Sequence, residues 1–214
     1  MSHDLVCVID DDAEVRGSLD SLLRATGLAV RTFASPSEFM ACELAETASC
    51  LILDVRLQGA DGLDFQQELV DNDARLPIIL ISGHGDIPMT VRGMRAGALT
   101  FLPKPFEEEE MLSAVAEAIE RARRMRAATE EVNDVRMRYE GLTPREREIL
   151  GLVSAGLMNK QIAGRLELSE ITVKIHRGNL MRKMRAQSLA DLVRMAEALG
   201  VRQANVSRFA SART

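Results

Sequence analysis

The sequence predicts a doubly wound α/β domain with a five-stranded parallel sheet, followed by an all-helical domain of four helices. In residues 1–120, short apolar runs alternate five times with helix-like stretches, a pattern typical of a parallel sheet covered by helices on both faces. After this point only helix signals continue. The charge divides at the same place, because residues 1–120 carry a net charge of −14 and residues 121–214 a net charge of +9. This division indicates either an acidic unit joined to a nucleic-acid-binding unit, or a dipolar protein whose charges only keep it soluble.

Apolar runs and capping residues place the elements of the first half. Gly27 is expected to end the first helix, and Ser35 and Pro36 to cap and open the second. Ile87-Pro88 is expected to open the fourth helix in the same way. The strand-like runs fall near residues 5–9, 29–33, 50–54, 78–82 and 98–102, and the helix-like stretches near 13–26, 36–46, 62–72, 87–96 and 107–120.

A helical linker is expected between the two halves, over residues 121–140. This segment contains no proline or glycine, and Val132, Val135 and Tyr139 recur at helical spacing. The four glutamates at 107–110 lie at the start of the preceding helix, where they complement the helix dipole. The linker helix is interpreted as either self-pairing or solvated without a partner.

The basic half predicts four helices between residues 141 and 202. Thr143 and Glu146 form a capping box at the start of the first helix. Two of the later helices are joined by a tight turn and the second of them is basic, which is the pattern of a helix-turn-helix. A flexible tail is expected over residues 203–214. The remaining helices fall near 159–166, from the cap Ser169 to about Arg185, and over about 188–199.

Composition argues against several other classes of protein. The three cysteines have no C-x-x-C spacing, and Cys7 and Cys50 lie in or beside apolar strands, so we interpret them as core residues. The three histidines are scattered, which argues against a shared histidine metal site. The sequence shows no signal peptide and no long apolar span, so we expect a cytoplasmic protein without a membrane partner.

Polar side chains with a clear chemistry follow four of the predicted strands. In open α/β sheets, ligands bind outside the carboxyl ends of the strands, so these side chains should share one pocket. Carboxylates, a hydroxyl and an ammonium group suit a phosphoryl group and a divalent cation, and hard oxygen ligands favour Mg²⁺. The residues are Asp10 and Asp11, then Asp54, Ser82 and Lys104.

Several stretches resemble known families. Residues 4–120 resemble the receiver domain of two-component response regulators, most of all the FixJ group, in VIDDD (8–12), DVRL (54–57), ISGHGD (81–86) and KPF (104–106). Residues 142–200 resemble the LuxR-type, or NarL/FixJ-type, helix-turn-helix in LTPRE (142–146), NKQIA (159–163) and SEITVKIH (169–176). The resemblance implies a CheY-like receiver over residues 1–120 and a LuxR-type DNA-binding domain over residues 141–202.

The resemblance also implies roles for the residues of the pocket. Asp54 is the phosphoacceptor, and Asp10, Asp11, Asp54 and the backbone carbonyl of Arg56 hold Mg²⁺. The metal offsets the charge of the incoming phosphate, which leaves the carboxylate of Asp54 free to attack phosphorus in line. Ser82 and Lys104 contact the phosphoryl oxygens, Phe101 changes rotamer as Ser82 moves, and Lys104-Pro105 is a cis peptide.

One position departs from the pattern of the family. Gln58 stands where the family commonly has proline, four residues after the acceptor. A looser loop is expected there, which leaves the lifetime of the phosphoryl group open.

The same resemblance implies a transcriptional regulator rather than a turnover enzyme, apart from removal of its own phosphoryl group. A sensor histidine kinase phosphorylates Asp54, and the chain then forms a homodimer that binds double-stranded DNA, with RNA polymerase as a further partner. His176 is expected to pack inward rather than to contact DNA. The DNA-binding residues are Lys174, Ile175 and Gly178 toward the bases, and Thr172 and Arg177 toward the phosphates.

Two other kinds of protein fit this sequence less well. A Mg²⁺-dependent phosphatase with an aspartate nucleophile is disfavoured, because the segment Asp54-Val55-Arg56 offers no second carboxylate two residues after the acceptor. A DNA-binding regulator that is never phosphorylated is disfavoured because all five polar residues of the pocket are present.

Overall fold

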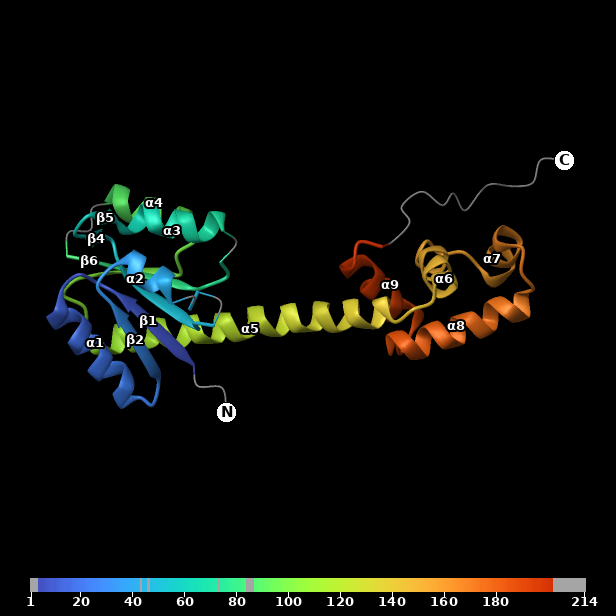
Figure 1. The fold of residues 1–214 in the computed structure, drawn as a ribbon, viewed down its shortest axis with the longest axis horizontal. Helices are drawn as coiled ribbons and strands as arrows, with labels where there is room; N and C mark the ends of the chain where they lie inside the picture. The colour runs from blue at the N-terminus through green and yellow to red at the C-terminus, as the bar shows by residue number, and fades with distance from the viewer. Residues whose placement is uncertain (1–3, 43, 46, 73, 84–86, 202–214) are drawn as a thin grey trace. The chain divides into compact units, whose positions relative to one another are not determined.

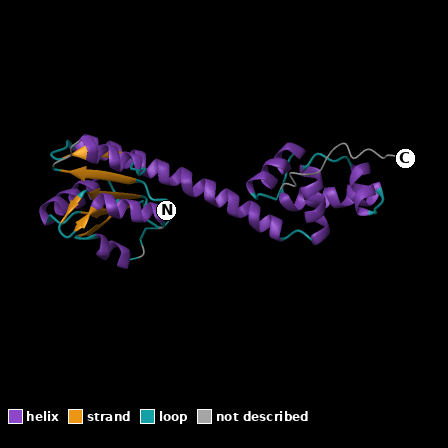
Figure 2. Cartoon of the chain, turned by 90° about the horizontal axis from the view of Figure 1, so that it is seen from above, coloured by secondary structure: helices purple, strands orange, loops and turns teal. Residues whose placement is uncertain are grey.

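The structure of the protein is a computed structural model that describes residues 4–42, 44–45, 47–72, 74–83 and 87–201 of the 214-residue chain. The chain divides into two compact units, Met1–Arg126 and Ala127–Thr214. Among the described residues, strands occur only in the first unit, as Figure 2 shows. His84 and the tail expected over residues 203–214 lie outside the described residues.

The first unit is built on a parallel five-stranded sheet, which confirms the predicted fold class. The strand order is β2-β1-β3-β6-β7, so the strand that ends in Asp54 is central. The chain moves outward from β1 to β2, then crosses to β3 on the other side of β1 and continues to β6 and β7, so its direction across the sheet reverses once, between β1 and β3. The strands are β1 (Leu5–Ile9), β2 (Ala29–Phe33), β3 (Cys50–Asp54), β6 (Ile78–Ser82) and β7 (Thr100–Pro103).

Helices cover both faces of this sheet, as Figure 1 shows. One face is covered by α1 (Ala13–Ala25) and the first part of α5 (Glu108–Glu140). The other face is covered by α2 (Pro36–Ala41), α3 (Gly62–Asp71) and α4 (Ile87–Arg95). The three central strands β1, β3 and β6 are apolar on both faces because both faces are covered, which explains their continuous apolar runs, whereas the edge strand β2 exposes Arg31 and Thr32.

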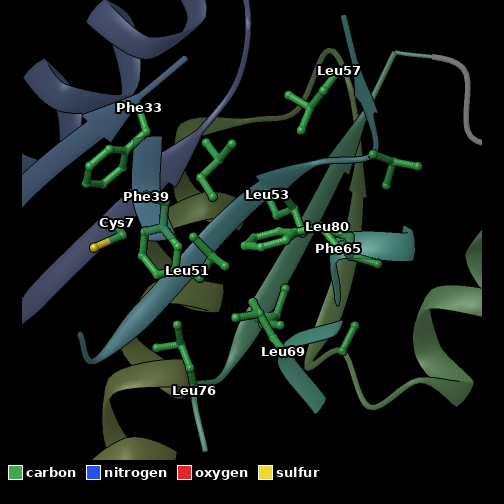
Figure 3. Packing of buried hydrophobic residues seen from close by; sticks show 14 of the residues in the cluster. Cys7, Phe33, Phe39, Leu51, Leu53, Leu57, Phe65, Leu69, Leu76 and Leu80 are labelled. Atoms are coloured by element: carbon green, nitrogen blue, oxygen red, sulfur yellow. The ribbon is translucent and has the colours of Figure 1, made fainter. Parts of the chain in front are cut away.

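The core on the side of α2 and α3 is rich in aromatic rings. Phe39 packs edge-on against Phe33 and Phe65, with ring centroids 5.5 and 6.2 Å apart. Cys7 lies in the same cluster, in which leucines from β3 and β6 surround the rings (Figure 3). Burial raises the pKa of the Cys7 thiol to about 12, so this cysteine stays protonated and acts as a small core residue, as predicted.

Helix α4 has a closely packed inner face and an open outer face. Gly93 is buried, and a Cβ at this position would overlap Leu80 and lie 3.2 Å from Leu63 Cδ2. The side chain of Gln66 donates a hydrogen bond from Nε2 to the carbonyl oxygen of Gly93 at 3.0 Å. The inner face therefore accepts no larger residue at position 93 without rearrangement. On the outer face, Ile87, Val91 and Met94 are exposed, and they share that face because they lie four and three residues apart.

Three elements differ from the sequence-based prediction. The helix expected over 36–46 ends at Ala41, because the chain turns back toward β3 and Ser49 N–H donates to Leu5 O at 2.7 Å. The strand expected over 98–102 begins at Thr100, because Ala98 N–H instead donates to the carbonyl oxygen of Gly93 in α4.

The third difference is a small hairpin after Asp54, which the sequence did not predict. It pairs β4 (Arg56–Leu57) with β5 (Ala60–Asp61) in antiparallel register. Gly59 adopts a φ of +80° in the turn, where glycine is favoured. The residues on either side of Gln58 and Gly59 are therefore paired, and the effect of the missing proline on this turn stays a prediction.

Helix α5 continues without a break through residues 121–140. Within the first unit, Arg126 donates from Nη2 to the carbonyl oxygens of Thr47 at 2.9 Å and of Ala48 at 2.7 Å. Arg123 forms an ion pair with Asp4 at 2.6 Å. These contacts join α5 to the loop before β3 and to the segment before β1.

The second unit contains α6 (Pro144–Ser154), α7 (Asn159–Leu166), α8 (Glu170–Met184) and α9 (Leu189–Ala198). The predicted capping box of Thr143 and Glu146 is present, and Lys183 of α8 adds an ion pair to Glu146 at 2.7 Å. Burial raises the pKa of Glu146, but hydrogen bonds from Lys183 and Thr143 outweigh it and hold the pKa below its ordinary value. This buried carboxylate thus links the start of α6 to the end of α8.

The turn between α7 and α8 depends on a left-handed residue that is not glycine. Glu167 ends α7 with φ +55°, and Leu168 N–H donates to Ala163 O at 2.9 Å. Ser169 then caps α8 by accepting from Thr172 N–H at 3.1 Å.

The described helices include none that is both long and apolar enough to cross a membrane.

Candidate functional site

The sheet brings the predicted pocket residues to one edge. Asp10 follows β1, Asp54 and Ser82 are the last residues of β3 and β6, and Lys104 follows β7. In the parallel register Asp54 pairs with Ile81, and Ser82 with Pro103, so all these strands end at the same level. The carboxyl edge of the sheet therefore gathers acidic, hydroxyl and ammonium groups, as the order of the strands requires.

Lys104 forms a charged bridge in this pocket. Its Nζ lies 2.6 Å from Asp10 Oδ2 and 2.6 Å from Asp54 Oδ2. Asp10 is fully buried and Asp54 is 6% exposed, so these charge-assisted hydrogen bonds form in a region with little water. One ammonium group therefore bridges the two carboxylates that lie closest to the centre of the pocket.

Backbone amides orient the other oxygens of the same carboxylates. Asp12 N–H donates to Asp10 Oδ1 at 2.9 Å, and Arg56 N–H donates to Asp54 Oδ1 at 2.9 Å. Arg16 of α1 also donates to the carbonyl oxygen of Asp10 at 2.6 Å. Both carboxylates are thus held on two sides before any ligand arrives, which reduces the cost of ordering them later.

The pKa shifts in the pocket follow from burial and from the bridge. Burial raises the pKa of Asp10, and the hydrogen bond from Lys104 offsets this effect only in part. Burial by itself would lower the pKa of Lys104, but its hydrogen bonds to Asp10 and Asp54 outweigh burial and raise the pKa. Lys104 therefore remains charged at neutral pH.

Three carboxylates of the pocket are close enough to share a metal ion. The ligand oxygens of Asp10, Asp11 and Asp54 all lie within 4.8 Å of one another. A set made only of oxygen donors suits a hard divalent cation such as Mg²⁺, which uses one or two carboxylates together with waters and phosphate oxygens. The donor chemistry present therefore fits the metal that the sequence predicted. Arg56, whose carbonyl was the fourth predicted ligand, begins the β4–β5 hairpin two residues after Asp54.

Ser82 and Phe101 lie next to the pocket on neighbouring strands. Ser82 is buried, its carbonyl oxygen accepts from Lys104 N–H at 2.8 Å, and its hydroxyl contacts Met89 Sδ of α4 at 3.9 Å. Phe101 on β7 is half-buried against the core beneath α4. The peptide bond between Lys104 and Pro105 is cis. Ser82 therefore links the pocket with helix α4.

Sequence reasoning missed the role of Gly62 at this site. Its N–H donates to Val55 O at 2.9 Å, and a Cβ there would overlap the carbonyl oxygen of Asp54 and lie 2.8 Å from Val55 Cα. Only glycine lets α3 begin this close to the strand that carries Asp54. The one signal in the sequence was a glycine at the predicted start of a helix, where other residues serve better.

The predicted DNA-binding residues lie along α8. Lys174, Ile175 and Gly178 are exposed, and Thr172 is half-buried. Arg177 is also half-buried, and its Nη1 donates to Asn159 Oδ1 of α7 at 2.5 Å. The opposite face of the helix packs into the core of the second unit through Val173, Leu180 and Met184, and His176 is half-buried.

The helix carries the charge expected of a DNA-binding element. The segment Glu170–Met184 contains four lysine or arginine residues and one glutamate. A basic helix with one buried face and one exposed face, preceded by a short helix and a tight turn, has the arrangement of a recognition helix.

Comparison with known proteins identifies a family for each of the two units. Residues 6–116 match the family model described as "Response regulator receiver domain", and residues 140–196 match "Bacterial regulatory proteins, luxR family". The chain is 52% identical over 197 residues to "Nodulation protein W" of Bradyrhizobium diazoefficiens, covering 92% of this chain and 87% of that protein. It is 40% identical over 200 residues to "Transcriptional regulatory protein FixJ" of Rhizobium meliloti, covering 94% and 98%. The solved structure of response regulator StyR is similar with a TM-score of 0.81 and 45% identity, covering 91% of this chain and 98% of that one.

Proposed function

The chain belongs to the two-component response regulators that join a receiver domain to a LuxR-type DNA-binding domain, and we propose that a phosphoryl group on Asp54 controls its binding to DNA. Members of this family are transcriptional regulators and not classical enzymes. The observation that carries the proposal is the position of Asp54, at the end of the central strand beside Asp10, Asp11 and Lys104. We assign residues 1–120 to the receiver, 121–140 to a helical linker, 141–202 to the DNA-binding domain and 203–214 to a tail.

The phosphoryl donor in this proposal is the phosphohistidine of a sensor kinase. A carboxylate oxygen of Asp54 attacks phosphorus, the bond from phosphorus to the imidazole nitrogen breaks, and the imidazole leaves. Asp10, Asp11, Asp54 and the carbonyl of Arg56 would hold Mg²⁺, which would supply positive charge to offset the charge of the phosphoryl group. Lys104 already lies 2.6 Å from Asp54 Oδ2, so its ammonium group can transfer its hydrogen bond to a phosphoryl oxygen.

A conformational signal is proposed to leave the pocket through Ser82. Its hydroxyl turns from Met89 toward the phosphoryl oxygens, and Phe101 follows by changing rotamer. Because Ser82 contacts α4 before phosphorylation, this movement alters the outer face of α4, where Ile87, Val91 and Met94 are exposed. Two receivers pair through this face, and the homodimer presents two helix-turn-helix units to related half-sites on double-stranded DNA.

Five residues are proposed to contact DNA. Lys174, Ile175 and Gly178 face the bases, and Thr172 and Arg177 approach the phosphates. Arg177 would then share its guanidinium group between DNA and Asn159, with which it is paired in the free protein. RNA polymerase is a proposed further partner, and the need to reach DNA places the protein in the cytoplasm.

A turnover phosphatase fits the pocket less well. The position two residues after Asp54 is the exposed Arg56, which cannot act as the general acid that such an enzyme needs. In this proposal the chain can remove the phosphoryl group from its own Asp54 by hydrolysis, but it does not turn over an external substrate.

The proposal is tested by phosphorylation of the full chain with acetyl phosphate and Mg²⁺, with the mass of the intact protein as the readout. The wild type should gain one phosphoryl group and Asp54→Asn none, whereas Asp20→Asn, a control at a half-buried aspartate of α1 that pairs with Arg24, should behave as the wild type does. Phosphorylation should also tighten binding to a selected DNA duplex and raise the dimer fraction in sedimentation. Undiminished labelling of Asp54→Asn would exclude this aspartate as the acceptor.

A further inference from the structure

Helix α8 leaves two large apolar side chains in solvent. Ile171 is 73% exposed and Ile175 is 59% exposed, although the same helix buries Val173, Leu180 and Met184. The two isoleucines are four residues apart, so they lie side by side on one face of the helix. Neither side chain contributes to the packed core of the second unit. Single exposed apolar residues are ordinary, but an adjacent pair at the start of a basic helix indicates a contact with something outside the domain.

Gly178 extends the same face. It lies three residues after Ile175 and seven after Ile171, and a Cβ at position 178 would meet no atom within 4 Å. The packing of the domain therefore does not require glycine there, although glycine weakens a helix. Its absent side chain lowers the surface beside the isoleucines, so that the backbone of α8 can approach a partner closely.

The charges around this strip favour DNA as the partner. Lys174 lies between the two isoleucines in sequence and is exposed, and Arg182 lies on the same face further along the helix and is exposed. An apolar strip bordered by cations suits a groove that is bordered by phosphates and contains an apolar group. The major groove of DNA offers one such group, the C5-methyl of thymine, which is absent from cytosine.

We propose that Ile171 is a specificity-determining residue that packs against a thymine methyl group in the major groove, next to the contact made by Ile175. This inference rests on the proposed function, because it requires that α8 enters the groove. Ile171 is the second residue of α8, and the N-terminal residues of a recognition helix are the ones that reach base edges. The side chain would thus distinguish a T·A pair from a C·G pair without a hydrogen bond.

The experiment uses the full-length chain with Mg²⁺ and acetyl phosphate, and a duplex selected by that chain from a random library. Each thymine of the duplex is replaced in turn by deoxyuridine, which keeps base pairing and hydrogen-bonding groups and removes only the methyl. At the thymine read by Ile171, the wild type should bind about fourfold more weakly after this replacement, the factor expected for losing one buried methyl group. Ile171→Ala should bind both duplexes equally.

A matched control separates this effect from a general loss of binding. Leu189→Ala removes another exposed apolar side chain of the same domain, in α9, and should keep the full discrimination of the wild type. The inference is overturned if the wild type binds the selected duplex but tolerates deoxyuridine at every position, or if Ile171→Ala remains as sensitive as the wild type. It is also overturned if only Ile175→Ala abolishes the discrimination. A wild type that selects no sequence at all would overturn the proposed function, and this inference with it.

Discussion

One added methyl group at Gly62 should distort the strand that carries Asp54. In Gly62→Ala the new Cβ would overlap the carbonyl oxygen of Asp54 and lie 2.8 Å from Val55 Cα, where carbon atoms normally stay about 3.5–4.0 Å apart. Both obstacles are backbone atoms, so no change of rotamer relieves the overlap. The overpacking costs about 1–3 kcal/mol, and loss of the Gly62 N–H bond to Val55 O adds about 1 kcal/mol. We therefore expect a destabilisation of about 2–4 kcal/mol.

Amide hydrogen exchange of β3 in the full chain measures this loss within the first unit alone. The rate of labelling by acetyl phosphate should fall in the same variant, because the displaced segment is the one that carries the acceptor. Gly17→Ala is the matched control: position 17 lies in α1 with no atom within 4 Å of an added Cβ, so alanine should stabilise the unit by about 0.5–1 kcal/mol. An opening free energy for Gly62→Ala within about 0.5 kcal/mol of the wild type would refute the argument from overlap.

Three further predictions concern the second unit. Because the pKa of Glu146 is lowered in the folded state, its charge stabilises the fold above the ordinary pKa of 4.5, and this stabilisation is lost as the pH falls through the folded-state pKa. In urea unfolding from pH 6 down to about pH 3, Glu146→Gln should therefore weaken the fall of the unfolding free energy with pH, and an unchanged pH dependence would contradict this role. Glu167→Gly should stabilise the fold by about 0.5–1 kcal/mol and so raise its thermal midpoint, because relief of the left-handed strain at position 167 exceeds the entropy that glycine adds to the unfolded chain. A lower midpoint would show that the strain is absent. Lys174→Ala should cost about 1–3 kcal/mol of specific binding free energy and relax the preference at one base pair, whereas Arg177→Ala should weaken binding to all DNA sequences alike and make the slope of log affinity against log salt shallower by about one. Salt titrations that do not distinguish the two variants would contradict these roles.

The sequence predicted the elements whose signals are local. Apolar runs marked the central strands β1, β3 and β6 most clearly, because a parallel sheet covered on both faces demands continuous apolar segments there. Asp10 and Asp54 could be assigned to one pocket because parallel strands end at a common edge. Capping residues such as Ser35 and Thr143 marked where helices begin, and the structure shows both accepting the expected backbone hydrogen bonds.

The features that were missed depend on neighbours distant in the chain. The β4–β5 hairpin has strands of two residues, too short to show a period. The start of β7 was placed too early because Ala98 looks like a strand residue until its N–H is seen to bond with α4. Gly62 could not be assigned a role because its neighbour Asp54 lies eight residues earlier. Ile171 was not singled out in the sequence, because its 73% exposed side chain becomes evident only in the folded helix.

The two faces of α4 should evolve under different constraints. The inner face is fixed by Gly93, which cannot gain a side chain while Leu80 and Leu63 fill the space beneath it. The outer residues Ile87 and Met94 are 81% and 42% exposed, so substitutions there should cost little stability. A bacterium that keeps many duplicated regulators could therefore separate them by substitutions on this outer face alone. If receivers pair there as proposed, each copy could come to recognise only itself while the phosphoacceptor pocket and the sheet stay the same.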